Sequence, residues 1–267
     1  FTSNPEDYTN RGSIITPLKD RIQSQIYTHY PTSNLIGRTI TKQEVKRQKG
    51  QEHIVVPEVI EKLIEQVAIE ARGSEFIDAK SGVSARLPIS AYENILSAVE
   101  RRMLINGDEK GIARIGDLTA TIPAIIGKIE MVYEGEQEGA SNIARRLINQ
   151  AIRSIAPEYF NNIQHLSDKR APVELKEKFM LITSWFESGQ RLDLLNEMTQ
   201  SDFENEINNV AGLEEKVEGL TAVNSEKSVL KEFLLTALAA YSLLERKDLK
   251  QSVSFQDYFS SVVGGIG

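Results

Sequence analysis

Two arginines and one asparagine occur in short motifs of this sequence, and their side chains can bind phosphate oxygens. Asn4 lies in Asn4-Pro5-Glu6, Arg21 ends the run Pro17-Leu18-Lys19-Asp20-Arg21, and Arg86 ends Gly82-Val83-Ser84-Ala85-Arg86. A guanidinium is permanently charged and has five N–H donors that match phosphate or carboxylate oxygens. Whether these side chains can act together depends on the helices, strands and loops that carry them.

Arg86 comes just before a segment with strong helical periodicity. A cation at a helix N-terminus opposes the helix dipole unless an anion lies nearby. This placement favours a role for Arg86 in binding an anion. The Leu87-Pro88 pair that follows could delay the start of the helix by two residues and so change where Arg86 points.

Structural alternatives exist for the other two residues. Asn4 precedes Pro5 and could be an ordinary turn asparagine, and Arg21 could simply be an exposed arginine at a helix C-terminus, where its charge is mildly favourable. Asp20 could pair with Arg21 or contact a neighbouring protomer. Arg11 could lie at a subunit interface or in solvent.

A complete phosphate-binding site is absent from the sequence. No segment reads G-x-x-x-x-G-K-[ST], and no apolar strand ends in paired acidic residues that could hold Mg²⁺. Such a site needs backbone N–H groups at a helix start together with a lysine. We therefore expect the chain alone to bind ATP weakly.

Composition describes an ordinary globular protein and excludes several classes. Of the 267 residues 40% are hydrophobic and 26% charged, and the net charge of −7 argues against general nucleic-acid binding. With no cysteine and only three histidines (His29, His53 and His165), we expect no metal site. No apolar run approaches the length of a membrane span, and no secretory signal is evident, so a cytoplasmic protein is expected.

Helical periodicity dominates the sequence from residue 59 onward. We predict helices at about 59–71, 88–105, 116–131 and 141–155, which would form a small bundle, and further helices at about 173–187, 202–209 and 226–246. Pro123 should bend the third helix or mark its first turn. A strand is predicted over residues 25–30, after a helix that starts near Pro17.

The expected fold class is therefore mainly α. Residues 1–50 would form a small α/β strand-helix-strand unit, residues 51–160 an all-α helical unit, and residues 161–267 a further helical domain. The polar tract 161–172, which ends in Pro172, supports the second boundary.

The order of the three motifs resembles that of AAA+ ATPases of the magnesium chelatase and MoxR-type branch. In that resemblance Asn4-Pro5-Glu6 corresponds to sensor 1, Pro17 to Arg21 to the arginine-finger segment, and Gly82 to Arg86 to sensor 2. It covers the first 160 residues well and the last third more loosely. It implies the end of an AAA+ core, a helical lid and an extra helical domain.

The resemblance also implies roles and partners. Asn4 would position the attacking water, Arg21 would reach the site of a neighbouring subunit, and Arg86 would sense the γ-phosphate. ATP and Mg²⁺ would be held mainly by residues outside this chain, in a homo-oligomeric ring that remodels a client protein or helps to insert a metal. Arg11 and Asp20 would lie at subunit interfaces.

The alternative is a non-enzymatic helical interaction or adaptor protein. In that interpretation the two arginines and the asparagine are structural. A P-loop encoded upstream of Phe1 would distinguish the two hypotheses.

Overall fold

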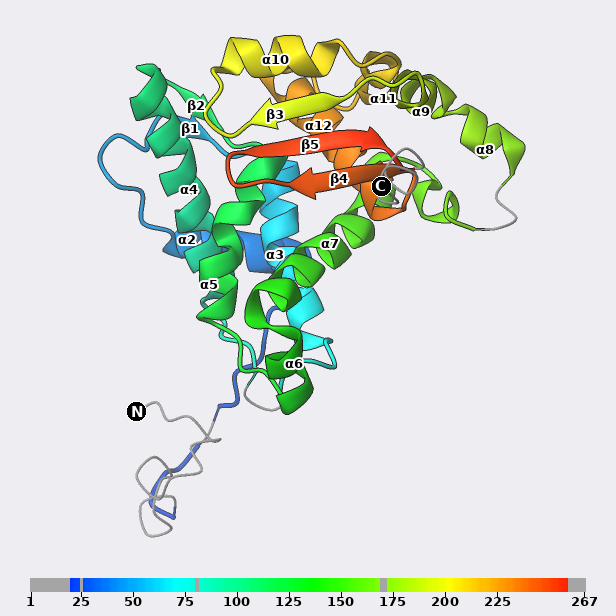
Figure 1. The fold of residues 1–267 in the computed structure, drawn as a ribbon. Coiled ribbons are helices and arrows are strands. Elements are labelled where there is room, and N and C mark those ends of the chain that lie inside the picture. Colours follow the sequence, from blue (N-terminus) through cyan, green and yellow to red (C-terminus); the bar gives the residue numbers. More distant parts are fainter. Residues whose placement is uncertain (1–19, 25, 80–81, 169–171, 259–267) are drawn as a thin grey trace.

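The computed structural model describes residues 20–24, 26–79, 82–168 and 172–258, and within them the chain is mainly helical, as predicted (Figure 1). The helical elements are α2 (Asn34–Glu44), α3 (Glu58–Arg72), α4 (Leu87–Asn106), η1 (Ile115–Thr121), α5 (Ile122–Ile126), α6 (Tyr133–Glu138), α7 (Ala140–Tyr159), η2 (Ile163–His165), α8 (Val173–Glu177), α9 (Met180–Glu187), α10 (Gln200–Asn208), α11 (Leu213–Val217) and α12 (Asn224–Ala240). The strands are β1 (Ile54–Val55), β2 (Gly111–Ile112), β3 (Leu192–Leu195), β4 (Leu244–Asp248) and β5 (Ser252–Asp257).

The predicted bundle is present and consists of α3, α4, α5 and α7; in Figure 1 α3, α5 and α7 lie below the three-stranded sheet and α4 lies to its left. Helix α3 packs against α4 and α7, and α5 packs against the same two helices. In α3 the apolar residues Ile60, Leu63, Ile64 and Val67 are buried on one face, as their spacing requires. A two-residue parallel pairing of β1 with β2 accompanies these helices, so this part of the chain is not entirely α.

The third bundle helix is shorter than the sequence predicted. Instead of one helix over 116–131, the 3₁₀ helix η1 is followed by α5, which ends at Ile126. Pro123 lies in the first turn of α5, where its missing N–H costs nothing, and Gly127 follows the last helical residue. Pro123 therefore marks a first turn rather than a bend.

The C-terminal part contains an antiparallel sheet that the sequence did not predict. The strand order is β3-β5-β4, with β5 in the middle. The helix predicted to reach Arg246 ends at Ala240, and Ser242, with φ of 62°, turns the chain into β4. β4 is an edge strand rich in charged residues, so it lacks the apolar alternation that identifies a strand.

Helix α12 is the centre of the C-terminal part. It packs against α7, η1, α10, α11 and β4, and every residue from Ser228 to Leu238 is buried. The sequence predicted a helix with one apolar face, whereas neighbouring elements cover it on all sides. The buried core is one cluster that runs from Ile54 to Phe255 and connects the bundle to the C-terminal part.

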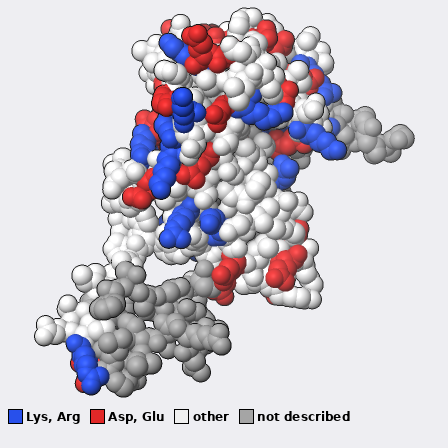
Figure 2. Space-filling model, turned by 90° about the vertical axis from the view of Figure 1, so that its left-hand side faces the viewer, with Lys and Arg blue, Asp and Glu red and all other residues white. Residues whose placement is uncertain are grey.

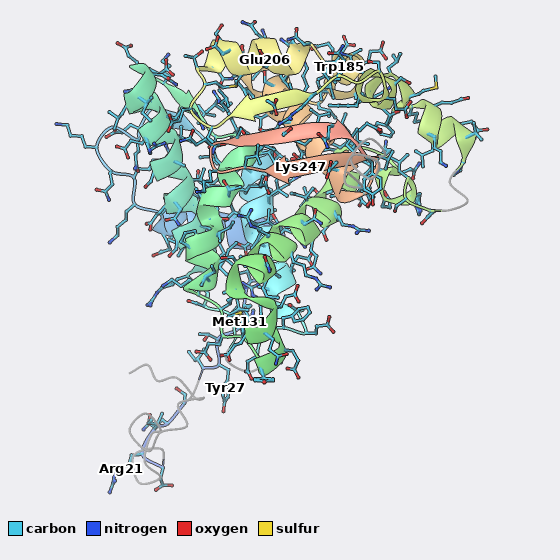
Figure 3. The ribbon with its side chains drawn as sticks, viewed as in Figure 1. Arg21, Tyr27, Met131, Trp185, Glu206 and Lys247 are labelled. Atoms are coloured by element: carbon cyan, nitrogen blue, oxygen red, sulfur yellow. The ribbon has the colours of Figure 1, made fainter. Side chains whose placement is uncertain are left out.

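The predicted strand over residues 25–30 is wrong for its described residues. Residues 26–30 have no strand pairing, and Ile26 and Tyr27 are 89% and 74% exposed. The described residues 20–24 and 26–30, here called the arm, extend away from the helical body, as the labelled Arg21 and Tyr27 show in Figure 3. A segment of β-branched and aromatic residues does not form a stable strand unless a neighbouring strand pairs with its backbone N–H and C=O groups. The only regular element in the described part of residues 1–50 is α2, which was not predicted and begins after Ser33, whose Oγ accepts a hydrogen bond from the Ile36 N–H.

Candidate functional site

Arg86 lies at the N-cap of α4 with its side chain exposed. Its guanidinium has no hydrogen bond or ion pair with the described residues. The helix begins at Leu87, so the two-residue delay considered from the sequence does not occur. Pro88 is tolerated because the N–H groups of the first turn have no partner within the helix in any case.

The loop before Arg86 is fixed by backbone hydrogen bonds to the segment that follows α5. The Ser84 N–H donates to the Lys128 carbonyl at 2.8 Å, and the Glu130 N–H donates to the Gly82 carbonyl at the same distance. Val83 forms an antiparallel bridge with Ile129. Arg86 is therefore held at the end of an ordered loop.

Two residues of the Gly-x-Ser-x-Arg motif have clear local roles. A Cβ at Gly82 would lie 2.0 Å from the Asp78 carbonyl oxygen, so only glycine fits here without displacement of the backbone. The Ser84 Oγ accepts a hydrogen bond from the Arg86 N–H at 3.2 Å. The motif thus builds the turn that brings the chain into α4.

Tyr30 connects the N-terminal arm to this loop. Its hydroxyl donates to the Val83 carbonyl, and the Arg72 guanidinium lies over its ring, 4.1 Å from the centroid. Sequence reasoning missed this contact because it placed Tyr30 in a strand. The aromatic residue just before Pro31 was the available signal.

The other predicted site residues are not brought to Arg86. Asp20 and Arg21 are exposed in a turn, and Figure 3 shows Arg21 on the arm, away from the helical body. Asn4 and Arg11 lie outside the described residues. The structure therefore places one of the predicted residues, Arg86, in a defined geometry.

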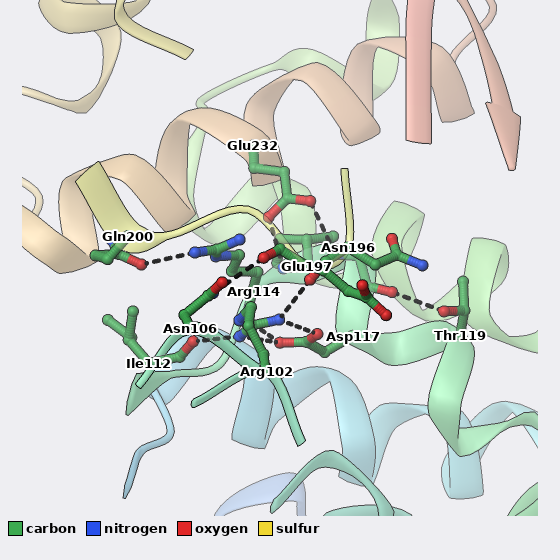
Figure 4. A network of polar contacts seen from close by, with 12 residues as sticks. Arg102, Asn106, Ile112, Arg114, Asp117, Thr119, Asn196, Glu197, Gln200 and Glu232 are labelled. Atoms are coloured by element: carbon green, nitrogen blue, oxygen red, sulfur yellow. Dashed lines mark hydrogen bonds and ion pairs between the residues drawn. The ribbon is translucent and has the colours of Figure 1, made fainter. Parts of the chain in front are cut away.

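A buried polar network joins the bundle to the C-terminal part (Figure 4). The Arg102 guanidinium on α4 donates two hydrogen bonds to the Asp117 carboxylate, at 2.7 and 3.0 Å, and one to the Ile112 carbonyl at 2.8 Å. Asp117 also accepts from the Arg114 N–H at 2.8 Å. Together these bonds fix the start of η1 against α4.

Arg114 extends the network to the loop between β3 and α10. Its Nη2 donates to the Thr199 carbonyl and the Gln200 side chain, and its guanidinium lies over the Phe203 ring at 4.3 Å from the centroid. Nε and Nη1 are buried and have no hydrogen-bond partner in the described part of the chain. Burial, together with the nearby charge of Arg102, lowers the Arg114 pKa to about 10.

Glu232 on α12 contacts the start of η1 and so joins α12 to this network. Its carboxylate accepts hydrogen bonds from the N–H groups of Ile115 (2.7 Å) and Gly116 (2.8 Å) at the start of η1. Complete burial raises the Glu232 pKa to about 7, against the opposing effects of Arg246 and these backbone donors. A glutamate directly before Phe233 of the apolar stripe of α12 was the available signal for this role.

Charged side chains and candidate metal ligands are spread across the described residues. Acidic and basic side chains are interspersed over the upper part of the face drawn in Figure 2. The described residues contain no group of three or more His, Asp or Glu side chains that could hold a metal ion. None of their helices combines the length and the apolar character needed to span a membrane.

Comparisons with protein-family models, with curated proteins and with solved structures gave no match for this chain.

Proposed function

We propose that this chain supplies sensing and helical parts of an AAA+ ATPase similar to the magnesium chelatase and MoxR-type branch. Such a protein couples ATP hydrolysis in a ring to the remodelling of a partner protein or to metal insertion. The observation that carries the proposal is Arg86: an exposed guanidinium with no partner among the described residues, held by an ordered loop at the start of the 20-residue helix α4.

Arg86 is suited to sensing a phosphate because hydrogen bonds fix the backbone of its loop, while no acidic side chain of the described residues pairs with its charge. Its own charge opposes the dipole of α4, and a bound anion would remove that conflict. A change in the position of the anion would change its interaction with Arg86 and so favour a different position of α4, which packs against α2, α3 and α5. In this proposal the helical bundle acts as the lid that follows nucleotide state.

The arm contributes the residues that act on a neighbouring subunit. Arg21 is exposed and lies away from the helical body, as an arginine that reaches another protomer would have to be. Tyr30 joins this arm to the Arg86 loop through Val83. Asn4 would position water, and Arg11 and Asp20 would contact the next subunit.

ATP and Mg²⁺ would be held mainly by residues outside this chain. The described residues offer no phosphate-cradling loop and no carboxylate cluster for Mg²⁺. Their contribution would be to orient and stabilise the γ-phosphoryl group, which is the main task in phosphoryl transfer.

The test uses the complete product of the encoding gene. We expect the reading frame upstream of Phe1 to contain a P-loop and a strand that ends in acidic residues, and we expect the product to hydrolyse ATP. Arg86→Ala should lower turnover about 100-fold, and Arg21→Ala about 10³-fold or more with nucleotide binding retained. Arg101→Ala, an exposed arginine on the same helix α4, is the matched control. A reading frame without a P-loop, or full turnover in both variants, would overturn the proposal.

An adaptor protein is the second candidate, and exposed apolar side chains on α2 favour it. Leu35, Ile36 and Ile40 are 64%, 46% and 43% exposed. A gene product that lacks both a P-loop and ATPase activity would support this alternative.

A further inference from the structure

A pocket lies where the bundle meets the C-terminal part, and neither the sequence analysis nor the proposed function uses it. It has a volume of about 440 Å³ and is bounded by α7, the η1–α5 segment, the end of α12 and β4. Figure 1 shows β4 passing above α7 at this junction. Ligand pockets of globular proteins have volumes of this order and favour junctions between structural units.

Part of the pocket's lining is apolar, beside the polar side chains of Thr119, Asn149 and Thr236. Leu118, Ile148 and Ile152 are buried beneath it, and Ile122 and Ala240 line it as partly buried residues. An apolar body placed here would remove hydrocarbon surface from water on both sides.

The rim is strongly basic, although the chain as a whole is acidic. Arg145, Arg146 and Arg246 line the pocket with a single carboxylate, that of Asp248. Arg246 bonds one Asp248 oxygen through Nε at 3.0 Å and Nη2 at 2.8 Å, and Arg145 approaches the other oxygen at 3.4 Å. Arg145 and Arg246 thus share the Asp248 carboxylate, and the Arg246 charge also acts on the buried Glu232 carboxylate.

Donors remain available for a second anion. The Nη1 group of Arg246 makes no hydrogen bond to the described residues, and the Arg246 side chain is only 15% exposed, so its position is fixed. Arg146 has no ion pair with the described residues and lies over the Phe76 ring. Guanidiniums held in this way form strong, directional bonds to carboxylate or phosphate.

We propose that this pocket binds a small amphipathic organic anion. The anionic head group would lie against Arg145 and Arg246, and the apolar body would cover Ile122, Ile148 and Ala240. The head group is a carboxylate or a phosphate, which the arginines can both bind. This inference does not depend on the proposed ATPase function.

Isothermal titration calorimetry of the chain with four probes tests the proposal. Octanoate and octyl phosphate carry both features, inorganic phosphate carries only the head group, and octanol carries only the apolar body. We expect at least one amphipathic probe to bind with a Kd of about 1 mM or tighter, and at least about tenfold tighter than inorganic phosphate and octanol. The tighter of the two amphipathic probes identifies the head group.

Three variants locate the binding. Arg145→Gln removes one guanidinium of the rim, and Ala240→Leu fills the apolar side without a change of charge. Each should weaken binding of the amphipathic probe about tenfold, as expected for loss of one charge-assisted bond or of pocket volume. Arg101→Gln, outside the pocket, should change the Kd less than about twofold, and circular dichroism verifies that each variant is folded.

Two results would overturn the proposal. One is the absence of binding for both amphipathic probes at about 10 mM, ten times the expected Kd. The other is binding that Arg145→Gln and Ala240→Leu leave unchanged in folded protein, since the ligand would then lie elsewhere.

Discussion

The Arg102 guanidinium holds the Asp117 carboxylate with two parallel hydrogen bonds, of 2.7 and 3.0 Å, and both side chains are more than nine-tenths buried. This pair fixes η1 against α4. The neighbouring Arg114 donates hydrogen bonds to the Thr199 carbonyl and the Gln200 side chain, which lie between β3 and α10 and at the start of α10. Stability and the geometry of the junction therefore both depend on the Arg102–Asp117 pair.

Breaking this pair from one side should be costly. Asp117→Asn leaves the Arg102 charge buried and removes the charged acceptor of the Arg114 N–H, so we expect a loss of about 3–5 kcal/mol in the free energy of unfolding. Urea denaturation measures the loss. Arg101→Ala removes an exposed pair with Glu197 and should cost less than about 1 kcal/mol. Similar losses in the two variants would show that the buried pair has no special role.

Glu232 should make stability depend on pH. Its pKa is raised from an ordinary 4.5 to about 7 in the folded protein, so the folded state binds this proton more tightly than the unfolded state does. The resulting stability is fully present below about pH 4.5 and is lost as pH rises through about 7, a change of about 3 kcal/mol.

Glu232→Gln removes this titration and retains one acceptor for the backbone donors of η1. The unfolding free energy of the wild type minus that of the variant should therefore become smaller as pH rises from 5 to 8. Burial also raises the Glu65 pKa to about 7, but Glu65 titrates in both proteins and cancels in the comparison. A difference that is constant with pH would contradict the assignment.

Gly82 should not tolerate a side chain. Gly82→Ala places a Cβ against the Asp78 carbonyl oxygen, and relief requires a backbone shift in the loop before Arg86. We expect a loss of about 1–3 kcal/mol in thermal or urea unfolding. At Gly73 the nearest atom to an added Cβ is 3.8 Å away, so Gly73→Ala is the matched control and should be nearly neutral. Equal tolerance at both positions would contradict the loop geometry.

Tyr30 should restrain the arm. Tyr30→Phe removes the hydrogen bond to Val83 but keeps the ring beneath Arg72, and we expect a local cost of about 1 kcal/mol. Hydrogen exchange should then be faster at amides near Tyr30 and in the 82–86 loop, with global unfolding little changed. Tyr27→Phe alters a 74% exposed tyrosine of the same arm and should leave these rates unaffected. Unchanged exchange in Tyr30→Phe would mean that the arm does not depend on this contact.

The chain by itself should bind Mg·ATP weakly. Without a P-loop the phosphates lack the backbone donors and the lysine that hold them, so calorimetry should give a Kd no tighter than about 1 mM. Tight binding would reveal a nucleotide site in these residues, which would contradict this expectation.

Local sequence patterns determined that α3, α4 and α7 are helical and where α3 and α4 end, but not the end of α5. The apolar period of α3, the Pro57 and Gly73 that flank it, and the Gly107 that follows α4 all act within a few residues, so their effects can be read from the chain. The same holds for Arg86, whose place before a helix is visible in the sequence. What Arg86 binds is not a local property, and its sensing role stays a proposal.

Tertiary structure alone decided the sheet, the burial of α12 and the polar junction. β4 and β5 are strands because they pair with each other and with β3, although charged residues hide the pattern in β4. Glu232 and Ile115 are 117 positions apart in the chain and meet only after α12 packs on η1. Strand pairing and buried polar contacts depend on partners distant in sequence, whereas helix periodicity depends on neighbours, and this difference separates what the sequence predicted from what it could not.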